Sequence, residues 1–279
     1  MKYMKKIVYV CELLLFLVVT IGPFVWAFVL SVTPDNAVFA PTVKLLPEHV
    51  TWAHYGELFS PDSRRGTAFF SAMLNSLRAV GITLCIGVPI AAIAAYALGR
   101  MEFKGRNLIK NLLLITMVIP VMATIIPLYR MFAAGEMLDN IFWLSIVYVS
   151  SYLPMAVWLI SNYFATIPRE LDEAARIDGC GEAKTFFYVM LPLSYPILIS
   201  VVLIMFLNTW SQFQIPLILA SSMETKPMAI IVSEFMTKDS VQYGLIAAAG
   251  MLALIPPAAA TLFFRKYLVA GMMKGSVKG

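Results

Sequence analysis

The stretch Glu173-Ala174-Ala175-Arg176-Ile177-Asp178-Gly179 is followed, after nine residues, by Val189-Met190-Leu191-Pro192. It lies between two very apolar stretches, begins with an acid and small residues, and is closed by glycine. A polar segment in this position is typical of a short helix exposed to water on the face of a membrane protein. The sequence therefore predicts a membrane-embedded chain with a helical loop at its surface.

The composition agrees with this prediction. Hydrophobic residues make up 60% of the chain and charged residues only 13%, whereas a soluble domain carries about 25% charged residues. Each long apolar run is sufficient to cross a hydrocarbon core of about 30 Å as a helix. We expect an all-α, polytopic membrane protein with one transmembrane domain over residues 1–279. The six runs cover about residues 7–30, 72–98, 108–129, 141–163, 193–219 and 243–264.

The distribution of basic residues predicts the topology. Most of the 21 Lys and Arg residues lie in the N-terminal segment, in the loops after the second and fourth runs, and after the sixth run. Since Lys and Arg gather on the cytoplasmic side, both termini should be cytoplasmic, with residues 164–191 as a cytoplasmic loop and 265–279 as a tail. This topology explains the net charge of +5. No basic stripe with interleaved aromatic residues points to nucleic acid.

Local signals within the cytoplasmic loop predict a compact helix–turn–helix. Pro168 can open a helix at its first turn, where the missing N–H costs nothing. Glu170, Asp172 and Glu173 then occupy the positive end of the helix dipole. Gly179 can end the helix in a left-handed conformation, and a second short helix follows over 182–190.

Other chemistry has little support in the sequence. The three cysteines, Cys11, Cys85 and Cys180, are far apart and indicate neither a disulfide nor a metal site. His49 and His54, with Glu48 and Glu57 nearby, fit surface histidines better than metal ligands. No nucleophile–base spacing indicates catalysis. The phosphate-binding pattern G-x-x-x-x-G-K-[ST] is absent from the sequence, so nucleotide energy would have to come from a partner.

The loop carries a specific pattern, E-A-A-x3-G-x9-V-x-L-P. It resembles the coupling-loop signature of permease subunits of binding-protein-dependent ABC importers, with Val189 where isoleucine is more usual. The runs Leu74-Asn75-Ser76-Leu77, 94–100 and 268–279 are similar to the carbohydrate-importer branch, in particular to the shorter, six-span permease of maltose-type sugar importers. Trp210-Ser211-Gln212-Phe213 departs from that branch, which more often has tryptophan, asparagine, an acid and an aromatic residue.

This resemblance implies the type I ABC importer permease fold and a set of partners. Two permease subunits, usually different but related chains, would form the pore in a bacterial or archaeal cytoplasmic membrane. Two ATPase subunits would use ATP and magnesium, an extracytoplasmic binding protein would deliver the sugar, and this chain would bind no cofactor. Residues expected to contact the ATPase are Leu171, Glu173, Ala174, Ala175, Arg176, Asp178 and Gly179, with Met272, Met273 and Gly275 of the tail as a second contact.

Polar residues inside the apolar runs are the candidates for the pore: Ser151, Tyr152, Asn208, Trp210 and Gln212. They are costly in a membrane unless they pair or line a cavity, and Trp210 could stack on a sugar face. Hydrogen bonds between helices remain an equal alternative.

The charge of the predicted spans indicates the class of substrate. The spans offer few positive residues, which favours a neutral disaccharide or oligosaccharide over a glycerophosphate-type polyol ester. An ion-coupled secondary transporter would need acids near the middle of a span, and a membrane enzyme would need clustered catalytic groups; the sequence offers neither.

Overall fold

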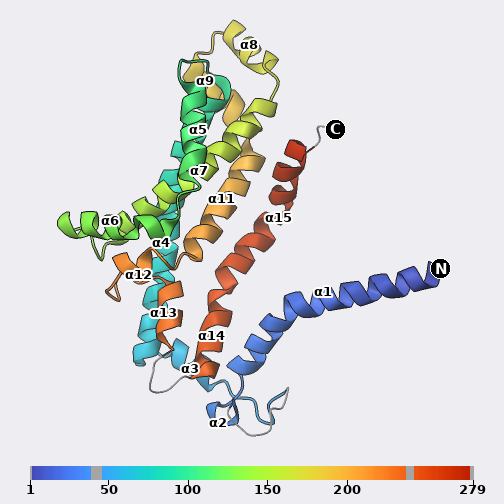
Figure 1. Cartoon of the computed structure of the whole chain (residues 1–279), viewed down its shortest axis with the longest axis vertical. Coiled ribbons are helices and arrows are strands. Elements are labelled where there is room, and N and C mark those ends of the chain that lie inside the picture. Colours follow the sequence, from blue (N-terminus) through green and yellow to red (C-terminus); the bar gives the residue numbers. More distant parts are fainter. Residues whose placement is uncertain (1, 39–45, 237–241, 277–279) are drawn as a thin grey trace. The chain divides into compact units, whose positions relative to one another are not determined.

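A computed structural model describes residues 2–38, 46–236 and 242–276, and side chains within 5–265. The described residues fold as helices joined by short turns (Figure 1), with no extended strand among them. The predicted all-α class is confirmed.

Four stretches are helical, long and apolar enough to cross a membrane. They coincide with the first, second, fourth and sixth predicted runs. They are α1 (Lys2–Ser31), α4 (Arg64–Arg100), α7 (Ile141–Thr166), and the stretch Tyr243–Arg265 within α14 (Tyr243–Ala253) and α15 (Ile255–Ser276).

Two further spans exist only as bent pairs of helices, and the predicted number of six is reached when each pair counts as one. The first pair, α5 (Arg106–Thr116) and α6 (Val121–Ala134), is bent by 94°. The second joins residues 182–193 to α11 (Tyr195–Trp210) with a bend of 77°.

The bends interrupt the apolar runs over 108–129 and 193–219, each of which contains prolines that tend to kink a helix. Pro120 is extended, with ψ 132°, and it follows a turn that ends α5. Ser194 leaves the helical region just before Pro196 at the start of α11. Because proline lacks an N–H and disfavours a helical residue before it, it sits more easily at a helix start than inside one. The run predicted over 193–219 also ends early as a helix: α11 stops at Trp210, and the short α12 (Pro216–Leu219) follows.

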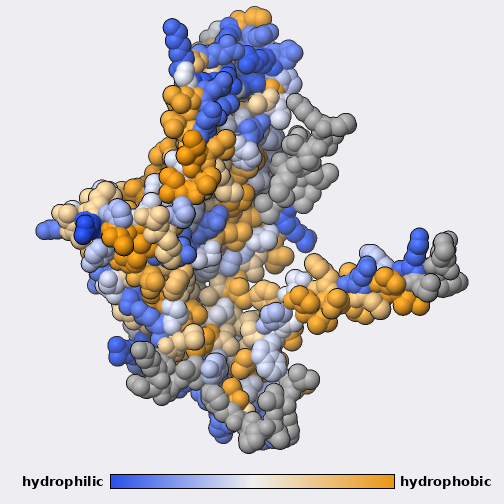
Figure 2. All heavy atoms as spheres, in the orientation of Figure 1, coloured by the Kyte–Doolittle hydropathy of each residue, from blue (hydrophilic) through white to orange (hydrophobic). Residues whose placement is uncertain are grey.

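The chain divides into two compact units. The first comprises residues 1–71 and 230–255. Within it, α1, α2 (Asp35–Val38) and α3 (Ala53–Phe59) all contact α14. Gly244 of α14 lies against the ring of His54, where an added Cβ would come within 2.3 Å. Large hydrophobic side chains are exposed along α1 (Figure 2), which leaves that helix an apolar surface suited to lipid.

The second unit comprises residues 72–229 and 256–279. Its main core lies between α4, α7 and α11, and includes Ala91, Ala95, Ile160, Phe164, Met190 and Val201. Helices α4 and α7 approach closely at Gly99, where an added Cβ would lie 3.1 Å from both Phe164 Cβ and the Ser161 carbonyl oxygen. This close approach fixes the end of α4 beside the end of α7.

A turn between α6 and α7 ties two further connections of the second unit together. Asp139 has a φ of +52°. One of its carboxylate oxygens, Oδ1, accepts hydrogen bonds from the N–H groups of Ser221 and Ser222, at 2.5 and 2.7 Å, and from the Thr225 hydroxyl at 2.9 Å. Close by in the sequence, α13 (Met228–Glu234) begins where the Met228 N–H donates to Ser76 Oγ at 2.8 Å. The segment after α12 is therefore held at both ends.

Candidate functional site

The predicted cytoplasmic loop contains α8 (Glu170–Ile177), which lies in the second unit at the end where α7 stops (Figure 1). The helix begins two residues after Pro168, so the proline lies outside its first turn, contrary to expectation. Instead, the Arg169 carbonyl accepts from the N–H groups of Asp172 and Glu173. Three acids occupy the first turn, as the sequence indicated, where they oppose the positive end of the helix dipole.

The end of α8 is closed by glycine, as predicted. Gly179 has a φ of +78°. Its N–H donates to the Arg176 carbonyl at 3.1 Å, and the Cys180 N–H donates to the Ala175 carbonyl at 2.9 Å. This pair of bonds is the Schellman arrangement, which satisfies carbonyls that a helix end otherwise leaves open. After the turn come α9 (Glu182–Thr185), a π-helical turn (Phe186–Met190) and α10 (Leu191–Leu193).

Arg100, the last residue of α4, anchors the start of this loop. Its Nε donates to Asp172 Oδ2 at 2.8 Å, and its Nη2 lies 2.6 Å from the same oxygen in an ion pair. Arg100 also donates to three carbonyls at the end of α7, those of Phe164, Ile167 and Pro168, at 2.7–3.2 Å. Its side chain is only 4% exposed. Removing one partner of a buried ion pair costs roughly 3–5 kcal/mol, so this contact holds the loop firmly.

One signal for this anchor is present in the sequence. An arginine directly after a long apolar run has to find acceptors, because it cannot stay unpaired at the edge of the hydrocarbon. Which acceptors it finds depends on the fold, since Asp172 is 72 residues away in sequence.

A second contact joins the other end of α8 to α4. Tyr96 donates its hydroxyl proton to Glu182 Oε2 at 2.8 Å, and Arg176 Nη2 donates to Glu182 Oε1 at 2.9 Å. The Tyr96 ring also packs against the rings of Phe164 and Phe186. Glu182 thus bridges the last turn of α8 to the last turns of α4.

A third contact is open to solvent. Arg169 Nη1 donates to Glu102 Oε1 at 2.8 Å, with both side chains more than half exposed. This hydrogen bond, with the charge of Arg169, holds the pKa of Glu102 below its usual range. Water screens such a pair, so it adds little stability.

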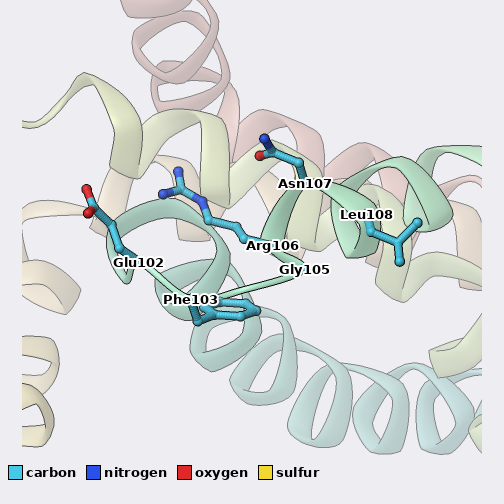
Figure 3. Close-up of a pocket in the computed structure, with 6 residues that line it drawn as sticks. All are labelled: Glu102, Phe103, Gly105, Arg106, Asn107 and Leu108. Atoms are coloured by element: carbon cyan, nitrogen blue, oxygen red, sulfur yellow. The ribbon is translucent and has the colours of Figure 1, made fainter.

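The connection between α4 and α5 forms a surface pocket beside this contact. Its lining consists of Glu102, Phe103, Gly105, Arg106, Asn107 and Leu108 (Figure 3). Arg106 reaches back from the start of α5 and donates to the carbonyls of Leu98, Gly99 and Met101. Two arginines with different tasks therefore meet at the end of α4: Arg106, from the start of α5, caps α4, and Arg100 holds the loop.

The predicted contact residues on α8 divide between two faces. Leu171, Glu173, Ala174, Asp178 and Gly179 are exposed, and Ala175 is buried. Arg176 is paired with Glu182, although its side chain is 66% exposed. Ile177, which was not among the predicted contacts, is 87% exposed. An apolar side chain so far exposed in a polar loop adds to the surface that a partner could cover.

The predicted pore residues are brought together in part. Tyr152 of α7 donates to the Asn208 carbonyl at 3.1 Å and accepts from Gln212 Nε2 at 2.9 Å. Ser151 instead donates to the Val147 carbonyl in its own helix. Trp210 is 7% exposed and its ring stacks on that of Phe206. The side chains of Tyr152 and Gln212 and the backbone carbonyl of Asn208 therefore form a polar cluster, whereas the Asn208 amide donates to the Ile204 carbonyl in its own helix.

The remaining candidates are placed as follows. Met272, Met273 and Gly275 lie in the last turns of α15, where side chains are outside the described residues. His54 Nδ1 lies 3.0 Å from the Ser31 carbonyl oxygen, and its Nε2 lies 3.4 Å from Asp35 Oδ1. Among the residues described, no group of three His, Cys, Asp or Glu side chains is arranged to hold a metal ion.

The chain is similar to known transport proteins. Residues 87–274 match the model of the family described as binding-protein-dependent transport system inner membrane component. The trehalose transport system permease protein SugB of Mycobacterium tuberculosis is 32% identical, with 92% of each chain covered. The trehalose/maltose transport system permease protein MalG of Thermococcus litoralis is 28% identical, with 99% of this chain and 98% of the relative covered.

A solved structure shares the fold. It is a chain of a bacterial ABC transporter involved in the import of the acidic polysaccharide alginate, with a TM-score of 0.82. The match covers 95% of this chain and 96% of the other, at 21% sequence identity. At that identity the likeness concerns the fold alone.

Proposed function

The chain belongs to the family of binding-protein-dependent transport system inner membrane components, and from this premise we propose that it is a permease subunit of an ATP-driven sugar importer. It forms half of a pore in the cytoplasmic membrane, with both termini in the cytoplasm. The other half is a second permease, usually a different chain. Two ATPase subunits bind and hydrolyse ATP with magnesium, and an extracytoplasmic binding protein delivers the substrate.

The single observation that carries the coupling role is the division of α8 into a held face and an exposed face. Arg100 and Glu182 hold the helix from within the second unit, while Leu171, Glu173 and Ile177 face outward. A short helix fixed in this way can sit in a cleft of an ATPase subunit and move with it. Closure of the ATPase pair on ATP then pulls on the permease, and hydrolysis resets it. The tail around Met272, Met273 and Gly275 is a second ATPase contact.

The proposed substrate is a neutral disaccharide or oligosaccharide. Tyr152 and Gln212 offer a hydroxyl and an amide, and Asn208 a backbone carbonyl, and such groups suit the hydroxyls of a sugar. No charged residue occurs in the sequence of α7 or α11, so an anionic substrate would find no counter-charge on these two helices. The named relatives transport trehalose and maltose. A glycerophosphate-type polyol ester is the alternative.

The experiment is reconstitution of the whole complex. The chain is purified in nanodiscs with its second permease and ATPase subunits, and ATP hydrolysis is measured with the binding protein plus trehalose, maltose, maltotriose, raffinose or glycerol 3-phosphate. We expect one of the neutral sugars to stimulate hydrolysis. Stimulation by glycerol 3-phosphate alone would select the alternative substrate. If no ATPase co-purifies, the importer role is wrong.

A further inference from the structure

We infer that α4 is the helix that receives the motion of α8, and that Arg100 and Tyr96 are the positioning residues that join the two. This inference rests on the proposed coupling role of α8. It adds the route by which movement passes from the loop into the membrane domain, and it assigns that route to two side chains of one helix.

Helices α4 and α8 are joined at two points, and the residues that join them have the same spacing on both helices. Tyr96 and Arg100 lie four residues apart on α4, and therefore share one face of that helix, one turn apart. Their counterparts on α8, Asp172 and Arg176, are also four residues apart. Arg100 binds Asp172 directly, and Tyr96 binds Arg176 through Glu182. Two contacts one turn apart limit how α8 can turn relative to α4. The Arg100 contact is the stronger of the two, because the Arg176 and Glu182 side chains are 66% and 46% exposed and water screens that pair.

The first point is bonded mainly through the arginine. Arg100 donates four hydrogen bonds, one to Asp172 Oδ2 and three to carbonyls at the end of α7, and its Nη2 lies 2.6 Å from the same Asp172 oxygen. The other Asp172 oxygen, Oδ1, is buried and has no hydrogen-bond partner among the described residues. The burial of Arg100 excludes water from its bonds and thereby strengthens them. The end of α7 is thus bound to the same arginine, so that α4, the end of α7 and α8 form one rigid corner.

The covalent connection that follows α8 is less stiff than this corner. Before α8, Ile167 and Pro168 lie outside any helix, but Arg100 holds their carbonyls. After α8 come the left-handed Gly179, a π-helical turn and the 77° bend at Ser194. Such breaks absorb changes of backbone angle. In contrast, α4 is one helix of 37 residues, which spans about 55 Å at 1.5 Å per residue. A displacement of its end therefore reaches far along the chain's longest helix.

The test uses the complete importer in proteoliposomes and measures sugar transported per ATP hydrolysed, with maltose and trehalose as probes. Arg100→Met keeps the length of the side chain and removes every donor. The matched control is Arg106→Met, because Arg106 also caps the end of α4 but bonds only to carbonyls of residues 98–101. A purely structural defect lowers transport and hydrolysis together and leaves their ratio unchanged, so the ratio isolates coupling.

We expect the ratio to fall by at least about fivefold in Arg100→Met, the lower end of typical coupling effects, and to stay within about twofold of wild type in Arg106→Met. ATPase subunits should still co-purify, since the exposed face of α8 is unaltered. An unchanged ratio in Arg100→Met, or an equal fall in Arg106→Met, overturns the inference. If wild type shows no hydrolysis dependent on binding protein, the proposed function has failed instead.

A second variant covers the case in which Arg100→Met does not assemble. Tyr96→Phe keeps the ring that packs on Phe164 and Phe186 and removes only the hydrogen bond to Glu182. The ratio should fall by about twofold or more, in keeping with the loss of one hydrogen bond to a charged group. A Tyr96→Phe complex with a wild-type ratio would show that α8 is not directed by α4.

Discussion

Replacing Gly179 with valine should uncouple transport from ATP hydrolysis while leaving the protein in the membrane. Gly179 holds a φ of +78° at the end of α8, and the two bonds that close this end depend on it. Valine resists that conformation, because a branched side chain crowds the following carbonyl. The last turn of α8 would therefore open, and the exposed Ile177 and Asp178 would leave their positions.

The magnitude follows from what surrounds the glycine. No heavy atom lies within 4 Å of an added Cβ, so the cost is confined to the backbone, roughly 1–2 kcal/mol for a left-handed residue other than glycine. That corresponds to about a 5- to 30-fold change in the ratio of closed to open turn. The core between α4 and α7 is not touched, so folding should survive. An eight-residue helix has little stability of its own. We therefore expect the loss of stability to appear as opening of α8.

The assay compares Gly179→Val with Gly181→Val. Gly181 has a φ of −75° and likewise has nothing within 4 Å of an added Cβ, so valine is tolerated there. Transport into proteoliposomes, stimulated hydrolysis, and amide exchange over 170–180 are measured for both variants. We expect transport to fall only in Gly179→Val, together with faster exchange at the end of α8. Equal transport in the two variants would refute the reasoning.

Three further predictions concern the second unit. Gly99→Leu should lower the free energy of unfolding by about 1–3 kcal/mol by forcing α4 and α7 apart, seen as a lower midpoint of thermal unfolding, whereas Gly81→Leu, with open space around it, should not. Burial raises the pKa of Asp139, but the hydrogen bonds that it accepts outweigh this effect and hold the pKa below its ordinary value. Its stabilisation is therefore complete above about pH 4 and lost as the pH falls through the lower folded value, so amide exchange over 221–225 should rise in acid, and Asp139→Asn should remove that dependence. Tyr152→Phe leaves Gln212 without its acceptor and should raise the KM for sugar by about fivefold, the effect of roughly 1 kcal/mol, and an unchanged KM would place the polar cluster outside the sugar path.

The long apolar helices could be predicted because length and hydrophobicity are local properties. Bends could not. Pro89 and Pro154 lie inside α4 and α7, which continue through them, whereas Pro120 marks the break between α5 and α6. All are prolines in apolar runs, and a local rule treats them alike. Whether the helix continues depends on packing around the proline, which lies beyond the run itself.

The same distinction separates what the sequence predicted about the site from what it did not. The turn at Gly179 was predicted, because a glycine after a short helix is a local signal. The contacts of Arg100 with Asp172 and of Tyr96 with Glu182 join residues 72 and 86 positions apart. No local pattern relates such residues, although an arginine at the end of an apolar run already indicates that acceptors must lie close by.

These long-range contacts give the short motif a physical meaning. In the segment Glu173–Gly179, Ala175 is buried and Arg176 is engaged with Glu182, while Glu173, Ala174 and Ile177 are exposed. One face of a helix of two turns therefore binds the chain that carries it, and the other remains open to a partner. A helix this short cannot transmit force through its own stability. It can do so only when its inner face is attached to something stiffer, and α4 supplies that attachment at two points one turn apart.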